Sequence, residues 1–118
     1  MRQDINPRLT TEDIKGTVEY YTQLLDFECE SQDVEGGWAS VSREGINITF
    51  SVPSEQDPSE NSSFTGSVYI YAEDVEGIWE RIKGRVRICY PLESFVYGKR
   101  EFGIYDNNGY LLKFGQAI

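Results

Sequence analysis

Residues 97–115 read YGKREFGIYDNNGYLLKFG, and this stretch predicts a hairpin of two β-strands. Apolar residues recur at every second position on both sides of the tetrapeptide DNNG at residues 106–109. Asn and Gly accept the positive φ that a tight hairpin turn requires. We therefore expect strands over residues 100–105 and 110–114.

The segment that closes this hairpin has a counterpart earlier in the chain. NGYLLKF at residues 108–114 is similar to EGINITF at 44–50, and their glycines lie 109 − 45 = 64 residues apart. In the same way, DVEG at 74–77 repeats DIKG at 13–16 after 74 − 13 = 61 residues. We therefore predict a duplicated unit of one strand, one helix and three strands, with a period of about sixty residues.

Apolar spacing predicts the other elements of each unit. Residues 14–27 and 75–83 place apolar side chains three and four positions apart, as one face of a helix requires, with an Asp before each segment. Apolar residues at alternate positions predict strands over residues 38–41, 46–52 and 68–72. The sequence is thus typical of a folded chain with both helices and strands.

A polar segment, residues 53–66, separates the two repeats. It is rich in Ser, Glu and Pro and has no apolar period before Phe64, so we expect an exposed linker. The full length of 118 residues is that of one compact domain. We therefore predict a single domain, residues 1–118, made of two repeats that span about 1–52 and 67–118.

The charge balance argues against several classes of partner. Lys and Arg number 11 against 20 Asp and Glu, and the resulting net charge of −9 repels nucleic acid. No apolar run has the length of a membrane helix, and no secretory segment opens the sequence. We therefore expect a cytoplasmic protein that binds neither nucleic acid nor membranes.

Residues that commonly bind transition metals are scarce. The sequence contains no His, which removes the commonest general base and the commonest transition-metal ligand together. Its two cysteines, Cys29 and Cys89, form no CxxC motif. We expect them to be buried thiols rather than parts of a zinc or redox site.

Two stretches resemble a known family. DIKGTVEYYTQLLDFE at residues 13–28 is similar to the first helix of the vicinal oxygen chelate superfamily, which contains glyoxalases, bleomycin-resistance proteins and extradiol dioxygenases. Residues 97–115 resemble the last hairpin of that superfamily more specifically. Two departures are Asp26, where the family usually has Gly, and Asn107, where it often has Pro. The resemblance extends in order over nearly the whole chain.

The resemblance implies an α+β fold of two tandem βαβββ modules that form a curved mixed sheet around a cup, usually in a homodimer. In the family's enzymes, side chains from four equivalent strand positions, mostly His and Glu, hold a divalent metal at the floor of the cup. These positions correspond to Asn6, Thr49, Ser67 and Lys113. None of them is His, Asp or Glu, and an ammonium group repels a cation. We therefore expect no metal, no other cofactor and no catalytic residue.

Strand alternation predicts which residues line this cup. When Thr49, Ser67 and Lys113 point inward, every second residue of their strands does so too, and the residues between them, nearly all apolar, pack against the helices. Aromatic rings and hydroxyls at the inward positions suit a planar organic ligand. Glu101 and Lys113 either contact this ligand or pair with each other. The expected ligand-binding residues are Trp38, Asn47, Thr49, Ser67, Tyr69, Tyr71, Glu101, Tyr105, Leu111 and Lys113.

Three functions are compatible with these residues. The first is a metal-free protein similar to bleomycin-resistance proteins, which sequesters a small aromatic or cationic compound and thereby gives antibiotic resistance. The net charge of −9 attracts a cation, whereas Lys113 opposes one. The second is a glyoxalase-like lyase or isomerase, or a dioxygenase-type enzyme, with an atypical site. In that case either Glu101 or Lys113 acts as acid or base without a metal, or other residues than those named above hold a metal. The third is a non-catalytic interaction module that acts through its dimer.

We favour the first of these functions. The sequence leaves open the identity of the ligand and any remaining catalysis. It also leaves open whether the two modules of one cup come from one chain or from two.

Overall fold

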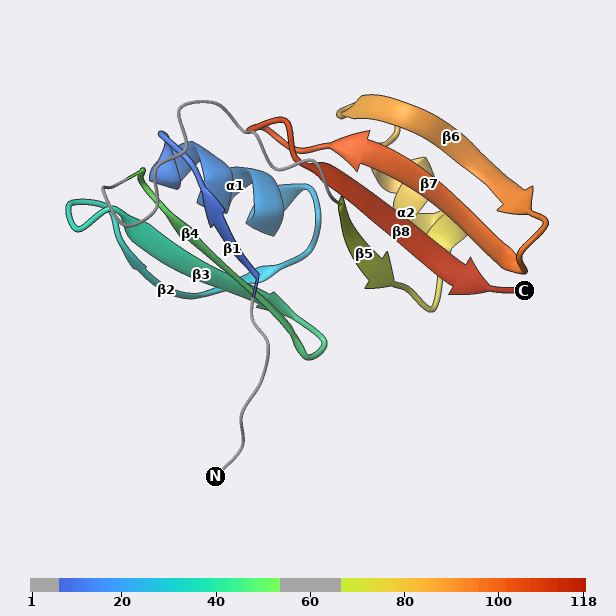
Figure 1. The fold of residues 1–118 in the computed structure, drawn as a ribbon, viewed down its shortest axis with the longest axis horizontal. Coiled ribbons are helices and arrows are strands. Elements are labelled where there is room, and N and C mark those ends of the chain that lie inside the picture. Colours follow the sequence, from blue (N-terminus) through green and yellow to red (C-terminus); the bar gives the residue numbers. More distant parts are fainter. Residues whose placement is uncertain (1–6, 54–66) are drawn as a thin grey trace. The chain divides into compact units, whose positions relative to one another are not determined.

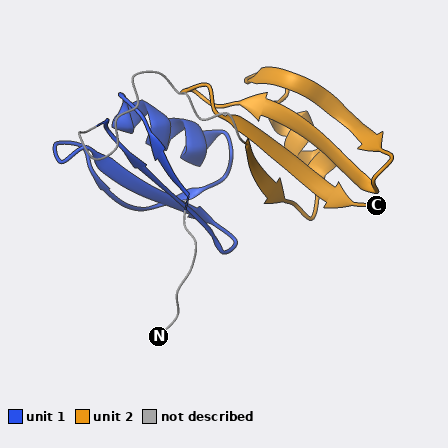
Figure 2. Ribbon diagram, in the orientation of Figure 1, with its two compact units in different colours: residues 1–63 blue, residues 64–118 orange. Residues whose placement is uncertain are grey.

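The computed structural model describes residues 7–53 and 67–118, which fall into two compact units. Unit 1 comprises residues 1–63 and unit 2 comprises residues 64–118 (Figure 2). Each unit contains, in chain order, one strand, one helix and three further strands (Figure 1). The predicted α+β fold with two βαβββ modules is therefore confirmed.

Unit 1 is a four-stranded mixed sheet with one helix. Its elements are β1 (Arg8–Thr10), α1 (Ile14–Gln23), β2 (Glu28–Asp33), β3 (Trp38–Arg43) and β4 (Ile46–Ser51). The strand order is β1-β4-β3-β2. The first and last strands of the unit, β1 and β4, run parallel, while the other neighbours are antiparallel.

Unit 2 repeats this topology. Its elements are β5 (Ser67–Tyr71), α2 (Val75–Ile82), β6 (Arg87–Phe95), β7 (Lys99–Tyr105) and β8 (Leu111–Ala117). The strand order is β5-β8-β7-β6, again with the first and last strands parallel and the other neighbours antiparallel. The equivalence of the two sheets explains why the sequence motifs recur along the chain.

The repeated Asp-x-x-Gly motif begins both helices. The Asp13 carboxylate accepts a hydrogen bond of 2.9 Å from the Gly16 N–H, and Asp74 accepts one of 3.1 Å from Gly77. These bonds satisfy a backbone donor that the first turn of a helix leaves without a partner. A β-carbon at Gly16 would lie 2.2 Å from Asp13 Oδ2, so a larger residue at this position would make the capping carboxylate shift.

The closing hairpin of unit 2 forms as predicted, with a turn built around Asp106. This side chain is buried and accepts hydrogen bonds from the N–H groups of Asn108 and Tyr110, at 2.8 and 2.9 Å. Gly109 has a φ of 88°, in the left-handed region where a side chain would be strained. Gly45, its counterpart in the β3–β4 turn of unit 1, has the same φ.

One face of each sheet packs against the helix of its own unit. In unit 1, the fully buried Tyr21 of α1 places its ring centroid 4.9 Å from that of Phe50 on β4. In unit 2, Phe102 and Phe114 stack with centroids 5.2 Å apart, and Trp79 of α2 lies 5.1 Å from Phe102. Burial of each such side chain contributes about 1.5–3 kcal/mol to stability. The apolar positions predicted to face the helices therefore form the two cores.

The first helix ends earlier than predicted. The apolar spacing continues to Phe27, whereas α1 ends at Gln23. Asp26 has a φ of 61°, and a residue with positive φ does not continue a right-handed helix. The Phe27 N–H instead donates to the carbonyl of Tyr21, at 3.0 Å, and the Phe27 ring enters the core from a loop.

The edge strands β2 and β6 are not located by sequence periodicity. Most of their side chains are exposed, and their pairing register shifts after Cys29 in β2 and on both sides of Tyr90 in β6. Such bulges interrupt the alternation of apolar and polar residues. Cys29 is half-buried and Cys89 is exposed, so the expectation of two buried thiols is wrong.

Two predictions fall on residues that the structure does not describe. Asn6 and residues 54–66, which form nearly all of the predicted linker, lie outside the described ranges. The linker and the single-domain organisation therefore stay predictions. Within the described ranges, neither helix has the length and apolar character needed to cross a membrane.

Candidate functional site

The most distinctive group of side chains lies on the face of the unit 2 sheet opposite α2. Phe102, Ile104 and Leu112 point toward α2 and are fully buried, so the alternate residues of β7 and β8 point to the other side. We call this other side the tyrosine face. It carries Ser67, Tyr69, Tyr71, Arg87, Tyr90, Glu93, Phe95, Lys99, Glu101, Tyr105, Leu111 and Lys113.

Glu101 is the buried centre of the tyrosine face. It is 2% exposed, although it is a charged residue. The Tyr69 hydroxyl donates a hydrogen bond of 2.9 Å to its Oε1, and the Tyr90 hydroxyl donates one of 2.5 Å to its Oε2. A buried carboxylate is costly unless it receives such bonds, so the two tyrosines stabilise its position.

Two glycines make room for these tyrosine rings. A β-carbon at Gly115 would lie 1.9 Å from the Tyr69 hydroxyl oxygen, and one at Gly103 would lie 2.4 Å from Tyr90 Cε1. Gly115 is the cross-strand partner of Glu101, and Gly103 follows Glu101 by two residues on β7. The rings therefore lie over bare backbone on either side of the carboxylate.

Electrostatics keep this cluster in one protonation state at neutral pH. Burial acts to raise the pKa of the Glu101 carboxyl, but hydrogen bonds from tyrosine hydroxyls outweigh burial and hold the pKa below its ordinary value. Tyr97 is one of these tyrosines beside Tyr69 and Tyr90, and the charge of Lys113 lowers the pKa further. Burial, followed by the hydrogen bond to Glu101, raises the pKa of Tyr69 and of Tyr90. The carboxylate is thus ionised while the hydroxyls stay protonated donors.

Additional rings and cations surround this cluster. Tyr71 is 68% exposed, and its ring centroid lies 5.0 Å from that of Tyr69. Lys99 Nζ lies 5.0 Å from the centroid of the Tyr71 ring. Arg87 Cζ lies 4.6 Å from the centroid of the Tyr105 ring. Both distances fit cation–π contacts, so two of the rings on the tyrosine face each lie beside a positive charge.

The corresponding face of unit 1 is polar, with charged side chains only on its outer strands β1 and β2 among the described residues. Ser40 and Thr49 are cross-strand partners on β3 and β4, and the Ser40 hydroxyl donates a hydrogen bond of 2.7 Å to Asn47 Oδ1. Trp38, on the same side of β3, is 39% exposed. The predicted residues Trp38, Asn47 and Thr49 therefore do share one face, but none of the described residues of unit 1 supplies a buried carboxylate like that of unit 2.

The residues that the resemblance places at the metal positions of the family's enzymes are poor donors. Thr49 and Ser67 supply neutral hydroxyls, and Lys113 supplies an ammonium group, while Asn6 lies outside the described residues. Such a donor set does not fit a divalent ion. Within residues 7–53 and 67–118, no group of three or more His, Cys, Asp or Glu residues could hold a metal ion.

The structure brings the unit 2 members of the predicted site onto one face. Ser67, Tyr69, Tyr71, Glu101, Tyr105, Leu111 and Lys113 all belong to the tyrosine face. Glu101 and Lys113 form no ion pair in the described part of the chain, although the lysine charge affects the pKa of the carboxyl. The cup that would combine these residues with those of unit 1 stays a prediction.

Sequence reasoning missed Arg87, Tyr90, Tyr97 and Lys99. Tyr90 lies between two register shifts on an edge strand, where alternation gives no guide to the direction of a side chain. A signal was nevertheless present in the sequence. Gly103 and Gly115 occupy positions where alternation predicts face residues, and a strand glycine marks the close approach of another group.

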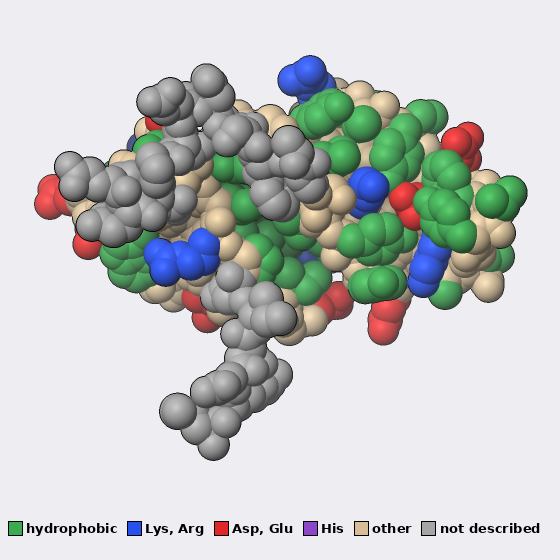
Figure 3. All heavy atoms as spheres, in the orientation of Figure 1, with side chains coloured by type: hydrophobic (Ala, Val, Ile, Leu, Met, Phe, Trp, Pro, Cys, Tyr) green, Lys and Arg blue, Asp and Glu red, His purple; other side chains and the backbone are tan. Residues whose placement is uncertain are grey.

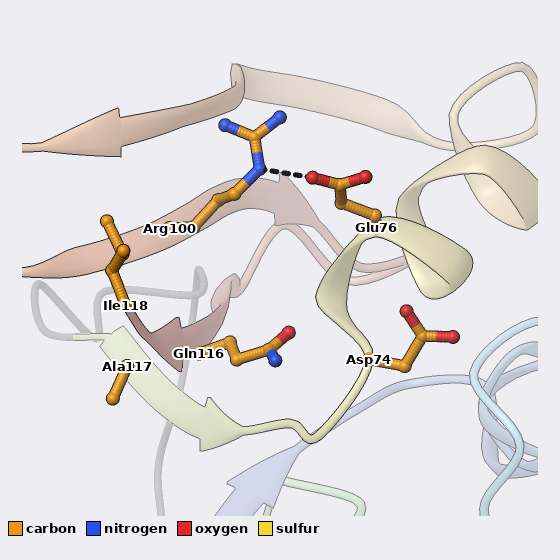
Figure 4. A pocket seen from close by; sticks show the side chains of 6 residues that line it. All are labelled: Asp74, Glu76, Arg100, Gln116, Ala117 and Ile118. Atoms are coloured by element: carbon orange, nitrogen blue, oxygen red, sulfur yellow. Dashed lines mark hydrogen bonds and ion pairs between the residues drawn. The ribbon is translucent and has the colours of Figure 1, made fainter.

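A hollow in unit 2 lies on the helix side of the sheet. It has a volume of 270 Å³ and is lined by Asp74, Glu76, Arg100, Gln116, Ala117 and Ile118 (Figure 4). Its polar groups serve the fold: Arg100 Nε lies 2.7 Å from Glu76 Oε1, and Gln116 Oε1 accepts a hydrogen bond of 2.9 Å from the Val75 N–H. We therefore assign this hollow a structural role at the start of α2.

Comparison with known sequences places the chain near one family. The family model described as "Glyoxalase/Bleomycin resistance protein/Dioxygenase superfamily" matches residues 5–114. No curated protein matches the sequence.

Several solved structures share the fold at low identity. The bleomycin-binding protein from Streptomyces verticillus, solved with copper(II)-bleomycin, is 24% identical with a TM-score of 0.72, over 97% of this chain and 95% of that one. TioX from Micromonospora sp. ML1 is 18% identical with a TM-score of 0.80, over 99% and 100% of the chains. A bleomycin resistance determinant encoded on transposon Tn5 is 19% identical with a TM-score of 0.77, over 98% of both chains.

Proposed function

The chain belongs to the Glyoxalase/Bleomycin resistance protein/Dioxygenase superfamily, and from this premise we propose that it is a metal-free protein that sequesters a small aromatic compound without altering it. The observation that carries the proposal is the tyrosine face, where a buried carboxylate holds aromatic rings in place. Aromatic side chains with a few fixed polar groups are typical of sites for organic ligands.

The rings are held in place before any ligand binds. Tyr69 and Tyr90 are each fixed at the hydroxyl end by Glu101 and at the ring by a glycine backbone. Rings that are already ordered lose little conformational entropy when a ligand stacks on them, which favours affinity. Tyr71, which is exposed and contacts Tyr69, offers the most accessible ring surface.

The donor chemistry favours binding over metal-assisted catalysis. The hydroxyls of Thr49 and Ser67 and the ammonium of Lys113 stand where the resemblance puts the metal ligands of the family's enzymes. Glu101 is hydrogen-bonded by tyrosine hydroxyls and has a lowered pKa, so it is a weak base. The bleomycin-binding protein from Streptomyces verticillus supports a binding role in the same family.

Three further parts of the proposal come from the resemblance and the composition. They are a homodimer, a cytoplasmic location and a role in antibiotic resistance. Analytical ultracentrifugation tests the first. A susceptibility assay with bleomycin in cells that express the protein tests the last, and unchanged susceptibility would remove antibiotic resistance from the proposal.

The binding function can be tested by what co-purifies and by what binds. We expect mass spectrometry of the native protein to identify an aromatic compound that is released unaltered. Tyr71→Ala should weaken binding of that compound, or of naphthamide as a neutral aromatic probe, whereas the matched control Tyr71→Phe retains the ring and should retain affinity. The proposal fails if no aromatic compound co-purifies and naphthamide does not bind at millimolar concentration.

A further inference from the structure

Positive charges collect on the tyrosine face of a strongly acidic protein. The chain has a net charge of −9, yet this face carries Lys113 on β8, Lys99 on β7 and Arg87 on β6. Over unit 2, Figure 3 shows side chains of the hydrophobic class, which includes Tyr, with both basic and acidic side chains among them. The local charge of this face is therefore opposite to the net charge of the molecule.

One of the two carboxylates of this face, that of Glu101, is withheld from contact. Glu101 is only 2% exposed, and hydroxyl groups of Tyr69 and Tyr90 occupy both of its oxygens. A ligand that lies on the tyrosine rings cannot reach this carboxylate directly. Glu93 is exposed and opposes Glu101 in register, but it lies on the edge strand β6, two strands away from Lys113.

Lys113 differs from the other two cations of the face. Lys99 lies over the Tyr71 ring and Arg87 over the Tyr105 ring. Lys113 is half-buried beside Tyr69, its cross-strand partner. Its charge lowers the pKa of Glu101, but within the described residues it forms no hydrogen bond or ion pair. A partly buried ammonium group gains most from an anionic partner, because water solvates it less well there.

We propose that the ligand of the tyrosine face is an aromatic compound with an anionic group, such as a carboxylate, and that Lys113 binds this group. The inference rests on the proposed binding function and specifies its ligand class. An aromatic acid stacks its ring on the exposed tyrosines and places its oxyanion on the ammonium. A cationic compound, although attracted at long range by the net charge, would meet Lys113 on contact and be repelled.

Three naphthalene probes of similar shape separate the possible ligand charges. Binding of naphthoate, naphthamide and naphthylmethylammonium is measured by calorimetry on the full chain at physiological salt. We expect naphthoate to bind about tenfold more tightly than naphthamide, because a hydrogen bond to a charged group contributes about that much. Naphthylmethylammonium is expected to bind most weakly.

Substitutions assign the effect to one lysine. Lys113→Met should lower the affinity for naphthoate about tenfold and change the affinity for naphthamide by no more than about twofold. Lys113→Arg should retain the preference for naphthoate over naphthamide. Lys83→Met is the matched control: it makes the same change in net charge at the exposed C-terminal end of α2 and should change neither affinity. A circular dichroism melt of each variant checks that the fold is intact.

The outcomes distinguish this inference from the proposed function. Equal affinity for naphthoate and naphthamide, or tighter binding of naphthylmethylammonium, would overturn the anionic ligand while the binding function stands. A preference for naphthoate that survives Lys113→Met would overturn the role of this lysine. Absence of binding by all three probes at millimolar concentration would count against the binding function itself and against the inference with it.

Discussion

Gly115→Ala probes the arrangement of the tyrosine face at its tightest point. The added β-carbon would lie 1.9 Å from the Tyr69 hydroxyl oxygen and 2.6 Å from Tyr69 Cζ, so the ring must move. Crowding of this kind costs about 1–3 kcal/mol, and loss of a hydrogen bond to a charged group costs about 1.5–3 kcal/mol. Because the two effects share one displacement, we expect the free energy of unfolding to fall by about 2–4 kcal/mol.

Urea denaturation followed by tryptophan fluorescence measures this change. Gly84→Ala is the matched control, because a β-carbon at Gly84 meets nothing within 4 Å, and it should change stability by no more than about 0.5 kcal/mol. A second test uses the Tyr69→Ala background, in which the obstructing ring is gone. There Gly115→Ala should cost about 0.5 kcal/mol or less. An equal cost of Gly115→Ala in both backgrounds would refute the packing of Tyr69 over Gly115.

Three further predictions concern charge and capping. Glu101→Gln should destabilise the protein by about 1–3 kcal/mol, because one tyrosine hydroxyl loses its acceptor; a matched Glu93→Gln at the exposed edge should have little effect. The pKa of Glu101 is lowered in the folded protein, so the ionised carboxylate contributes to stability above its ordinary pKa of 4.5, and this contribution is lost as the pH falls below that value. The free energies of unfolding of wild type and Glu101→Gln, measured as a function of pH, should therefore converge at low pH. Asp74→Ala should lower the free energy of unfolding, measured by urea denaturation, by about 1 kcal/mol because α2 loses its N-terminal cap. Glu73→Ala, at the neighbouring position, should leave the free energy of unfolding unchanged.

Local chemistry made much of the fold predictable from the sequence. The two Asp-x-x-Gly motifs are helix caps in which the glycine leaves room for the nearby carboxylate. Alternation in β7 and β8 correctly separated Phe102 and Phe114, in the core, from Glu101 on the opposite side. These features depend on neighbours in sequence or on an adjacent strand, so a pattern can reveal them.

The missed features depend on irregular backbone. Asp26 ends the first helix through a positive φ, which the apolar spacing does not reveal. Tyr90 reaches Glu101 only because β6 shifts its register on both sides of that residue. The burial of Glu101 follows from ring positions on two other strands, and no local pattern around residue 101 indicates it.

The central claim is that the tyrosine face binds an aromatic compound without a metal. The most direct measurement is an NMR titration of naphthoate into protein with labelled tyrosine rings, prepared in the presence of a chelator. The account predicts saturable shifts of the Tyr69, Tyr71 and Tyr90 ring signals in this metal-free protein. Shifts that appear only after a divalent metal is added, or that leave these three rings unchanged, would contradict it.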